Sequence, residues 1–148
     1  RADMIVLGPG DLYTSLIPNL LVRDIAPALE SSKAKKVYVL NLMTKWGQTY
    51  NFTASDHIRV LEKYLGKTLD SVVVNSHALP RSALTLYAKQ HELPVADDLK
   101  KTYFKVIRAP VTSAVVTIKT KSDTIIRSLI RHDSARLALV LVRIAQSS

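Results

Sequence analysis

Asp3-Met-Ile-Val-Leu-Gly-Pro-Gly-Asp-Leu-Tyr-Thr-Ser15 joins a short apolar run to a glycine-rich turn near the start of the chain. Met4 to Leu7 has the character of a strand, and Gly8-Pro9-Gly10 ends it in a tight turn that a ligand can approach closely. The next residues place a carboxylate and three hydroxyls where a helix is expected to begin: Asp11, Tyr13, Thr14 and Ser15. Because a helix N-terminus presents free N–H groups and a partial positive charge, the segment suits the phosphates of a nucleotide.

The rest of the chain alternates between strand and helix patterns. Apolar runs predict strands at 36–41, 71–75 and 104–107, and helical spacing predicts helices at 24–32, 53–66, 82–90 and 134–146. The expected helix boundaries are N-caps at Asp24, Thr53 with Asp56, and Asp133, and a C-terminal stop at Gly66. β-Propensity adds a predicted strand at 114–119. This order predicts a Rossmann-like α/β fold, a parallel sheet with helices on its faces.

In such a sheet, ligands bind outside the carboxyl ends of the strands. The second and third predicted strands end in polar residues that can hydrogen-bond a sugar, a base or a phosphate: Asn41, Thr44 and Asn75. Their other interpretation is ordinary capping of strand ends.

Two further segments carry candidate site residues. Asp56-His57 pairs a carboxylate with an imidazole, although Asp56 also has the position of a helix cap. In Arg131-His132-Asp133, the arginine suits bidentate binding of phosphate. The alternative for this segment is a loop in which Asp133 caps the last helix and Arg131 pairs with a surface carboxylate.

Composition sets broader limits on the class of protein. With 148 residues, 47% hydrophobic and 22% charged, the chain is expected to fold as one domain over 1–148. No apolar run approaches the ~20 residues of a membrane span, and no secretory signal is recognised, so a soluble, cytoplasmic protein is expected. The net charge of +9 fits anionic ligands, or else reflects a missing acidic half. No nucleic-acid-binding module accompanies it, so nucleic acid is not an expected partner.

Several short sequence motifs together resemble those of the gluconeogenesis factor family, a branch of the group that includes the 2-phospho-L-lactate transferases. The matching motifs are Gly8-Pro-Gly-Asp-Leu-Tyr-Thr-Ser15, Ile17-Pro-Asn-Leu-Leu-Val22, Asn41-Leu-Met-Thr44, Asn51-Phe-Thr-Ala-Ser-Asp-His-Ile-Arg-Val-Leu61, Val74-Asn75 and Arg131-His-Asp133. They follow the family's order. The resemblance covers the C-terminal half of such a protein, and the N-terminal glycine-rich nucleotide-binding part has no counterpart here.

The resemblance implies a regulatory protein that binds a nucleotide sugar such as UDP-N-acetylglucosamine. Such proteins are associated with carbon metabolism, cell-wall synthesis and cell shape. The alternative is a transferase that moves a phospholactyl group from a nucleotide diphosphate donor with Mg²⁺. No nucleophile is evident, so no catalytic residue is assigned. A third interpretation is a structural interaction module whose loops bind no ligand. A homo-oligomer is also expected.

The chain departs from the family pattern after Thr44. Family members commonly have Gln-Pro-Gly-Glu-Thr-Asp where this chain has Lys45-Trp-Gly-Gln-Thr-Tyr50, so two carboxylates are replaced. Trp46 could stack on a base or sugar, or pack locally. Asp11 stands where many relatives have serine, and a carboxylate beside a phosphate needs a neutralising cation, which makes Mg²⁺ conceivable.

Overall fold

A four-stranded parallel sheet forms the centre of the molecule, in the order β1-β2-β3-β4. The structure is a computed structural model, and it describes residues 2–113 and 129–147. The strands are β1 (Met4–Leu7), β2 (Lys35–Val39), β3 (Ser71–Asn75) and β4 (Lys105–Ala109). The predicted parallel α/β arrangement is confirmed. The strand predicted at 114–119 lies outside the described residues.

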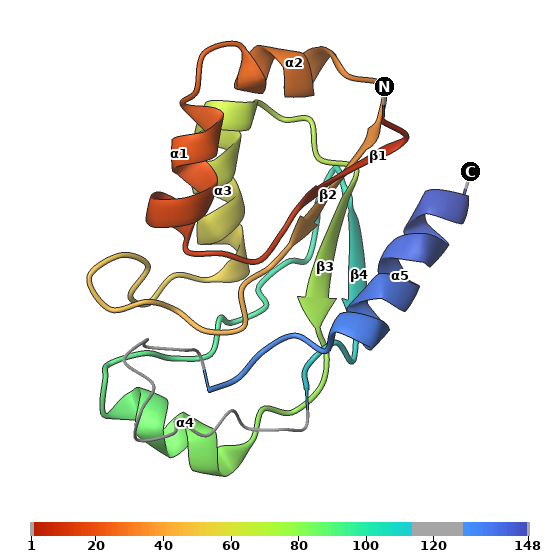
Figure 1. The fold of residues 1–148 in the computed structure, drawn as a ribbon. Helices are drawn as coiled ribbons and strands as arrows, with labels where there is room; N and C mark the ends of the chain where they lie inside the picture. Colours follow the sequence, from red (N-terminus) through yellow and green to blue (C-terminus); the bar gives the residue numbers. More distant parts are fainter. Residues whose placement is uncertain (1, 114–128, 148) are drawn as a thin grey trace, which may run out of the picture.

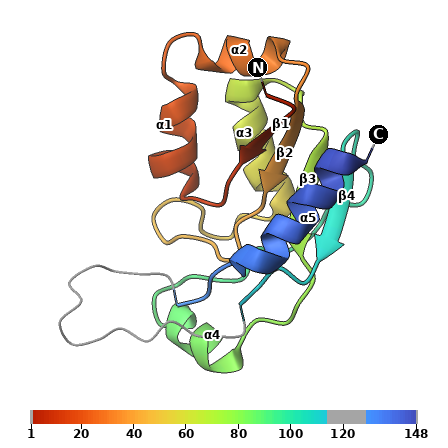
Figure 2. The ribbon, with the colours of Figure 1, turned by 45° about the vertical axis from the view of Figure 1, so that its right-hand side comes forward.

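The helices cover both faces of this sheet. In chain order they are the π-helix η1 (Leu12–Leu16), α1 (Ile17–Leu20), α2 (Ile25–Ser31), α3 (Ala54–Leu65), α4 (Arg81–Ala88) and α5 (Ser134–Gln146). Figure 1 shows α1, α2 and α3 on one face and α5 on the other. Figure 2 shows α5 crossing in front of β3 and β4, and α4 below the carboxyl ends of the strands.

The central strands β2 and β3 are buried because helices cover them on both sides. Successive side chains point to opposite faces. Tyr38 and Val72 therefore join the core under α1 and α3, whereas Val37 and Val73 join the core under α5. A third apolar cluster packs α4 against residues 42–43 and 129–130. Within the described residues, no helix has the length and apolar character needed to cross a membrane.

The helix ends test the predicted caps. Thr53 and Asp56 form both hydrogen bonds of the predicted capping box at the start of α3. At the other end, the predicted stop at Gly66 is the C-cap residue, and its backbone has φ +73°. Asp133 accepts a hydrogen bond from the Arg136 N–H at the start of α5 (3.0 Å). The prediction for Asp24 is wrong in mechanism: this residue precedes α2, but its backbone is left-handed (φ +68°) and its side chain makes no capping bond.

Candidate functional site

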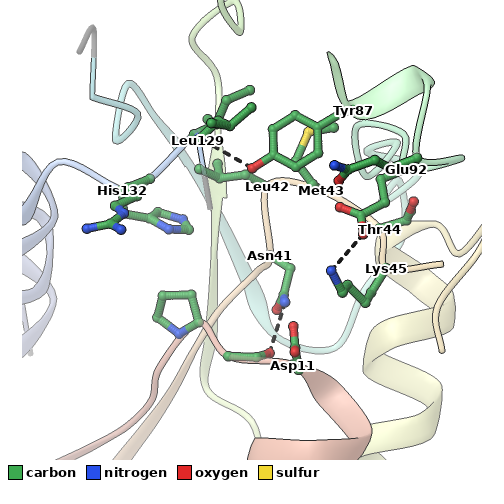
Figure 3. Close-up of a pocket in the computed structure, with 15 residues that line it drawn as sticks. Asp11, Asn41, Leu42, Met43, Thr44, Lys45, Tyr87, Glu92, Leu129 and His132 are labelled. Atoms are coloured by element: carbon green, nitrogen blue, oxygen red, sulfur yellow. Dashed lines mark hydrogen bonds and ion pairs between the residues drawn. The ribbon is translucent and has the colours of Figure 1, made fainter. Parts of the chain in front are cut away.

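A pocket of about 800 Å³ lies at the carboxyl end of the sheet, between the turns after β1 and β2 and the helix α4. Segment 129–132, which precedes α5, closes another side. Figure 3 shows His132 across the pocket from Lys45 and Glu92, with Asn41 and Asp11 below and between them. The lining consists of Pro9, Gly10, Asp11, Asn41, Leu42, Met43, Thr44, Lys45, Tyr87, Gln90, Glu92, Leu129, Ile130, Arg131 and His132.

The glycine turn reaches this pocket through its second half. Pro9, Gly10 and Asp11 line it, whereas Gly8 does not. A Cβ at Gly10 would lie 3.3 Å from the Ser15 Cβ, which is a tighter contact than ordinary packing allows. Glycine at this position therefore lets the turn fold close against η1.

Thr14 and Ser15 were predicted as hydroxyl donors to the ligand, but the structure does not bring them to the pocket. Both are exposed on η1 and neither belongs to the lining. The reason is the local conformation: residues 12–16 form a π-turn, in which the N–H groups of Ser15 and Leu16 both bond to the Asp11 carbonyl (2.8 and 3.2 Å). The turn presents Asp11 to the pocket and directs the following residues elsewhere.

Asn41 connects the turn after β1 to the end of β2. Its Nδ2 donates to the Gly10 carbonyl oxygen (2.9 Å), and its Oδ1 accepts from the Tyr38 hydroxyl at 3.4 Å. Tyr38 is fully buried, and burial raises the pKa of its phenol. The neutral phenol is a stable donor at neutral pH, so Asn41 is oriented by the core beneath the site.

Thr44 joins the same loop to segment 92–95. Its N–H donates to the Leu93 carbonyl (2.7 Å), and its Oγ1 accepts from the Leu93 N–H (2.9 Å). The hydroxyl is buried and keeps its own proton as a donor. Thr44 thus fixes one wall of the pocket and also supplies a polar group to the lining.

Sequence reasoning missed an ion pair in this wall. Lys45 Nζ lies 2.7 Å from Glu92 Oε1, and Glu92 is buried (6% exposed). The hydrogen bond from Lys45 to Glu92 holds the pKa of the lysine above its ordinary value, with Asp11 adding a smaller effect in the same direction. Lys45 therefore stays charged, and the pair joins the loop after β2 to the loop after α4.

Arg131 and His132 form the opposite wall. The Arg131 backbone carbonyl accepts from the Ser113 N–H (2.9 Å), and the Asp133 N–H donates to the Val111 carbonyl (2.7 Å), so this segment pairs with residues 111–113. Tyr87 supports it from α4, because its hydroxyl accepts from the Ile130 N–H (3.2 Å). Arg131 is exposed at the pocket.

Within this wall, His132 is in its neutral form. Burial lowers the pKa of His132, and a hydrogen bond to the Leu40 backbone opposes that effect in part. Its Nε2 is buried, and no partner for it is found among the described residues. An uncharged ring nitrogen beside the pocket can accept or donate one hydrogen bond, depending on its tautomer.

Asp56 and Asn75 are not brought to this pocket. Asp56 Oδ2 accepts from the Thr53 N–H (2.9 Å), and this bond holds the pKa of the carboxyl below its ordinary value. Asn75 uses its amide to bond the backbone of His77 (2.7 and 3.2 Å) and the Val111 N–H (3.2 Å). Asn75 lines a smaller cavity of about 180 Å³ together with Asn41. Asp56 thus caps a helix and Asn75 caps a strand end, which are the structural alternatives that the sequence offered for these residues.

Metal binding has limited support in the geometry. Within the described part of the chain, no group of three or more His, Cys, Asp or Glu side chains could hold a metal ion. Asp11 alone offers a carboxylate at the pocket that is not paired to a lysine. Because Mg²⁺ often takes one or two protein carboxylates and completes its shell with phosphates and water, Asp11 fits a metal that arrives with a phosphate ligand.

Comparisons with known proteins show the family of the chain. The family model described as 2-phospho-L-lactate transferase CofD matches residues 1–112. A Bacillus subtilis protein named gluconeogenesis factor is 38% identical over 146 residues, which are 96% of this chain and 43% of that protein. A Thermotoga maritima protein that is provisionally given the same name is 41% identical over 146 residues, covering 99% of this chain and 45% of that protein.

A solved structure gives the same result for the fold. The crystal structure of a UPF0052 family member from Bacillus halodurans superimposes with a TM-score of 0.82 at 32% identity, covering 96% of this chain and 43% of that one. The chain therefore spans less than half the length of the relatives it matches. From the family match and the curated relatives, we conclude that the chain belongs to the CofD family and is related to its gluconeogenesis factors.

Proposed function

We propose that this chain contributes the diphosphate-binding wall of a nucleotide-sugar site in a cytoplasmic regulatory protein of the gluconeogenesis factor type. UDP-N-acetylglucosamine is the test ligand. The role that we propose for the whole protein is control of carbon metabolism, cell-wall synthesis and cell shape through occupancy of this site. The relatives' name, gluconeogenesis factor, supports a metabolic role.

One observation carries the proposal. Four segments from distant parts of the sequence meet at one pocket at the carboxyl end of a parallel sheet, where such folds bind ligands. Gly10 brings bare backbone to it, Asn41 and Thr44 bring neutral polar groups, and Arg131 brings a guanidinium. This combination suits a ligand with a central diphosphate and polar rings on either side.

Arg131 is the group best suited to the diphosphate. A guanidinium can donate two parallel hydrogen bonds to phosphate oxygens, and it remains charged at every physiological pH. Arg131 lines the pocket next to His132, which lies across the pocket from Lys45 and Glu92 (Figure 3). Because the planar guanidinium matches two phosphate oxygens better than a lysine ammonium does, we assign the phosphate contact to Arg131.

Arg131→Ala tests this assignment. Loss of a charge-assisted contact should weaken UDP-N-acetylglucosamine binding by roughly 1.5–3 kcal/mol, measured by calorimetric titration. Arg143→Ala is the matched control, because it removes the same charge from an exposed position on α5 outside the pocket. Equal affinities of the two variants would remove Arg131 from the site. The same titration into the full-length Thermotoga maritima relative shows what the remainder of such a protein adds.

The alternative is a transferase of the phospholactyl type, and the description of the matching family model favours it as the second candidate. Asp11 would then hold a Mg²⁺ that is bound to the donor's phosphates. GDP with Mg²⁺ distinguishes the two functions: tighter binding than UDP-N-acetylglucosamine, lost on removal of Mg²⁺ or in Asp11→Asn, would favour the transferase. A homo-oligomer remains a prediction, which the molar mass from light scattering tests.

A further inference from the structure

We propose that Trp46, Tyr50 and His91 form a stacking surface for the nucleobase of the ligand at the rim of the pocket. We call these three side chains the aromatic rim. The proposal rests on the proposed function, because it assigns the base of the same ligand whose diphosphate lies against Arg131. It goes beyond that function by naming the residues that select a ligand with a flat ring.

The Trp46 ring contacts each of the other two rings. The Trp46 and Tyr50 ring centroids lie 4.8 Å apart in an edge-to-face arrangement (79°), and those of Trp46 and His91 lie 4.8 Å apart at a tilt of 39°. These are favourable geometries for aromatic pairs. Even so, Trp46 is 53% exposed and Tyr50 is 43% exposed. The indole is therefore held by two neighbours while much of its surface remains open to solvent.

None of the three rings belongs to the lining of the pocket, but Trp46 and His91 each adjoin lining residues in the chain. Trp46 follows Lys45, and His91 precedes Glu92, and the Lys45–Glu92 ion pair belongs to the lining. The ion pair thus joins the same two loops as the Trp46–His91 ring contact. The loop is further held as one turn, because the Lys45 N–H donates to Thr49 Oγ1 (2.9 Å) and the Thr49 N–H donates to the Lys45 carbonyl (2.9 Å).

The backbone of His91 is unusual in a way that fits a role for its ring. His91 follows the end of α4 with φ +58°, the left-handed conformation in which glycine is normally found. The Glu92 N–H donates to the Tyr87 carbonyl (3.0 Å) and closes this helix end. Side chains other than glycine are strained there, and such strain is often found at functional sites. An imidazole at this position brings a ring to Trp46 that glycine would not supply.

A nucleobase is the ligand group that this surface fits best. Bases stack on exposed aromatic rings with little dependence on their hydrogen-bonding pattern, and loss of one such ring typically weakens binding about 5- to 150-fold. If the diphosphate of the ligand lies in the pocket, its nucleobase can extend out of the pocket and stack on the aromatic rim. The sugar of the ligand would then lie in the polar part of the pocket, near Asn41 and Thr44.

The experiment uses the fact that Trp46 is the only tryptophan of the chain, so its fluorescence reports on the rim alone. UDP and inorganic diphosphate are titrated separately, with calorimetry for affinity and Trp46 emission for contact with the base. We expect UDP to change the emission and inorganic diphosphate to leave it unchanged. Trp46→Ala should weaken UDP binding about 5- to 150-fold and diphosphate binding less than about twofold.

Two further variants keep the test decisive if Trp46→Ala destabilises the loop. Trp46→Phe keeps a ring and should retain most of the affinity for UDP. His91→Gly relieves the left-handed backbone but removes a ring, so it should fold well and still bind UDP more weakly. Tyr64→Ala is the control, since Tyr64 is an exposed aromatic residue on α3 outside the pocket.

The outcomes separate the two proposals. If UDP binds and Arg131→Ala weakens it while Trp46→Ala and His91→Gly do not, the aromatic rim is overturned and the proposed function stands. Equal losses for UDP and diphosphate in Trp46→Ala would also overturn it, because stacking on a base cannot affect a ligand without one. If the wild-type chain and the full-length relative bind neither ligand, both proposals fail.

Discussion

The His57 imidazole lies wholly inside the protein, although its sequence position beside Asp56 suggested a role at a ligand. Its Nδ1 lies 2.9 Å from the Thr53 carbonyl oxygen, which can only accept, so Nδ1 carries the proton. The ring edge packs on Phe52 with centroids 5.5 Å apart. Burial lowers the pKa of His57 below its ordinary value of 6.5, and the Thr53 hydrogen bond opposes this only in part. The residue is a neutral core group of α3.

This environment predicts a pH dependence of stability. Because the folded-state pKa is depressed, the unfolded chain takes up a proton first as the pH falls below about 6.5. The free energy of unfolding should therefore be at its full value above pH 6.5 and decrease towards the folded-state pKa. His57→Asn keeps an N–H donor for Thr53, so it should make this decrease shallower in urea titrations at several pH values above about 5.

His132 shares the depressed pKa, so part of the decrease should remain in the His57→Asn variant. His77→Asn is the control, because His77 is exposed and it is the His77 backbone that bonds the Asn75 side chain. A wild-type slope in His57→Asn would show that burial of His57 does not contribute to the pH dependence.

The residues of the candidate site differ in how far the sequence could predict their placement. Asn41, Thr44 and Arg131 were predicted at strand or helix ends, and they lie at the pocket because strand ends share one edge of a parallel sheet. The Lys45–Glu92 pair joins residues 47 positions apart, and no local pattern indicates such a contact. Asp56 fits two roles in sequence, and in the structure it forms the capping box of α3.

Secondary-structure elements owe their ends to specific polar bonds. Thr53 Oγ1 accepts from the Asp56 N–H at the start of α3 (3.3 Å), and Asp133 does the same for α5. At the other end of α5, Lys35 Nζ donates to the Ile144 carbonyl (3.1 Å), and a cation there suits the negative end of the helix. The left-handed backbone of Asp24 could not be predicted from the sequence, because it depends on how the chain turns between α1 and α2.

The cap of α3 gives a prediction for stability. Thr53→Ala removes the acceptor for the Asp56 N–H and should lower the free energy of unfolding by about 0.5–2 kcal/mol. Chemical denaturation followed by circular dichroism measures the change. Thr85→Ala is the matched control in α4, where the exposed hydroxyl donates to the Arg81 carbonyl (3.1 Å). It should change stability by less than about 0.5 kcal/mol. A Thr53→Ala loss as small as that of the control would contradict the role of the box.

At the scale of the whole molecule, alternation of strands and helices predicts the parallel sheet and the edge at which ligands bind. The position of α4 could not be predicted this way. The helix lies below the strand ends rather than on a face of the sheet, because its apolar residues pack on the segments 42–43 and 129–130. That packing converts an open sheet edge into a walled pocket, so tertiary contacts rather than local pattern define the site.

The most direct test of the account is an NMR titration of the ¹⁵N-labelled chain with UDP-N-acetylglucosamine. We predict saturable shifts at the Gly10 and Arg131 N–H groups, the Asn41 side-chain amide and the Trp46 indole N–H. The Asp56 N–H and the Asn75 side-chain amide should shift least, because both are bonded within the protein away from the main pocket. Shifts centred on Asp56 or Asn75, or none at saturating ligand, would contradict the assignment of the pocket.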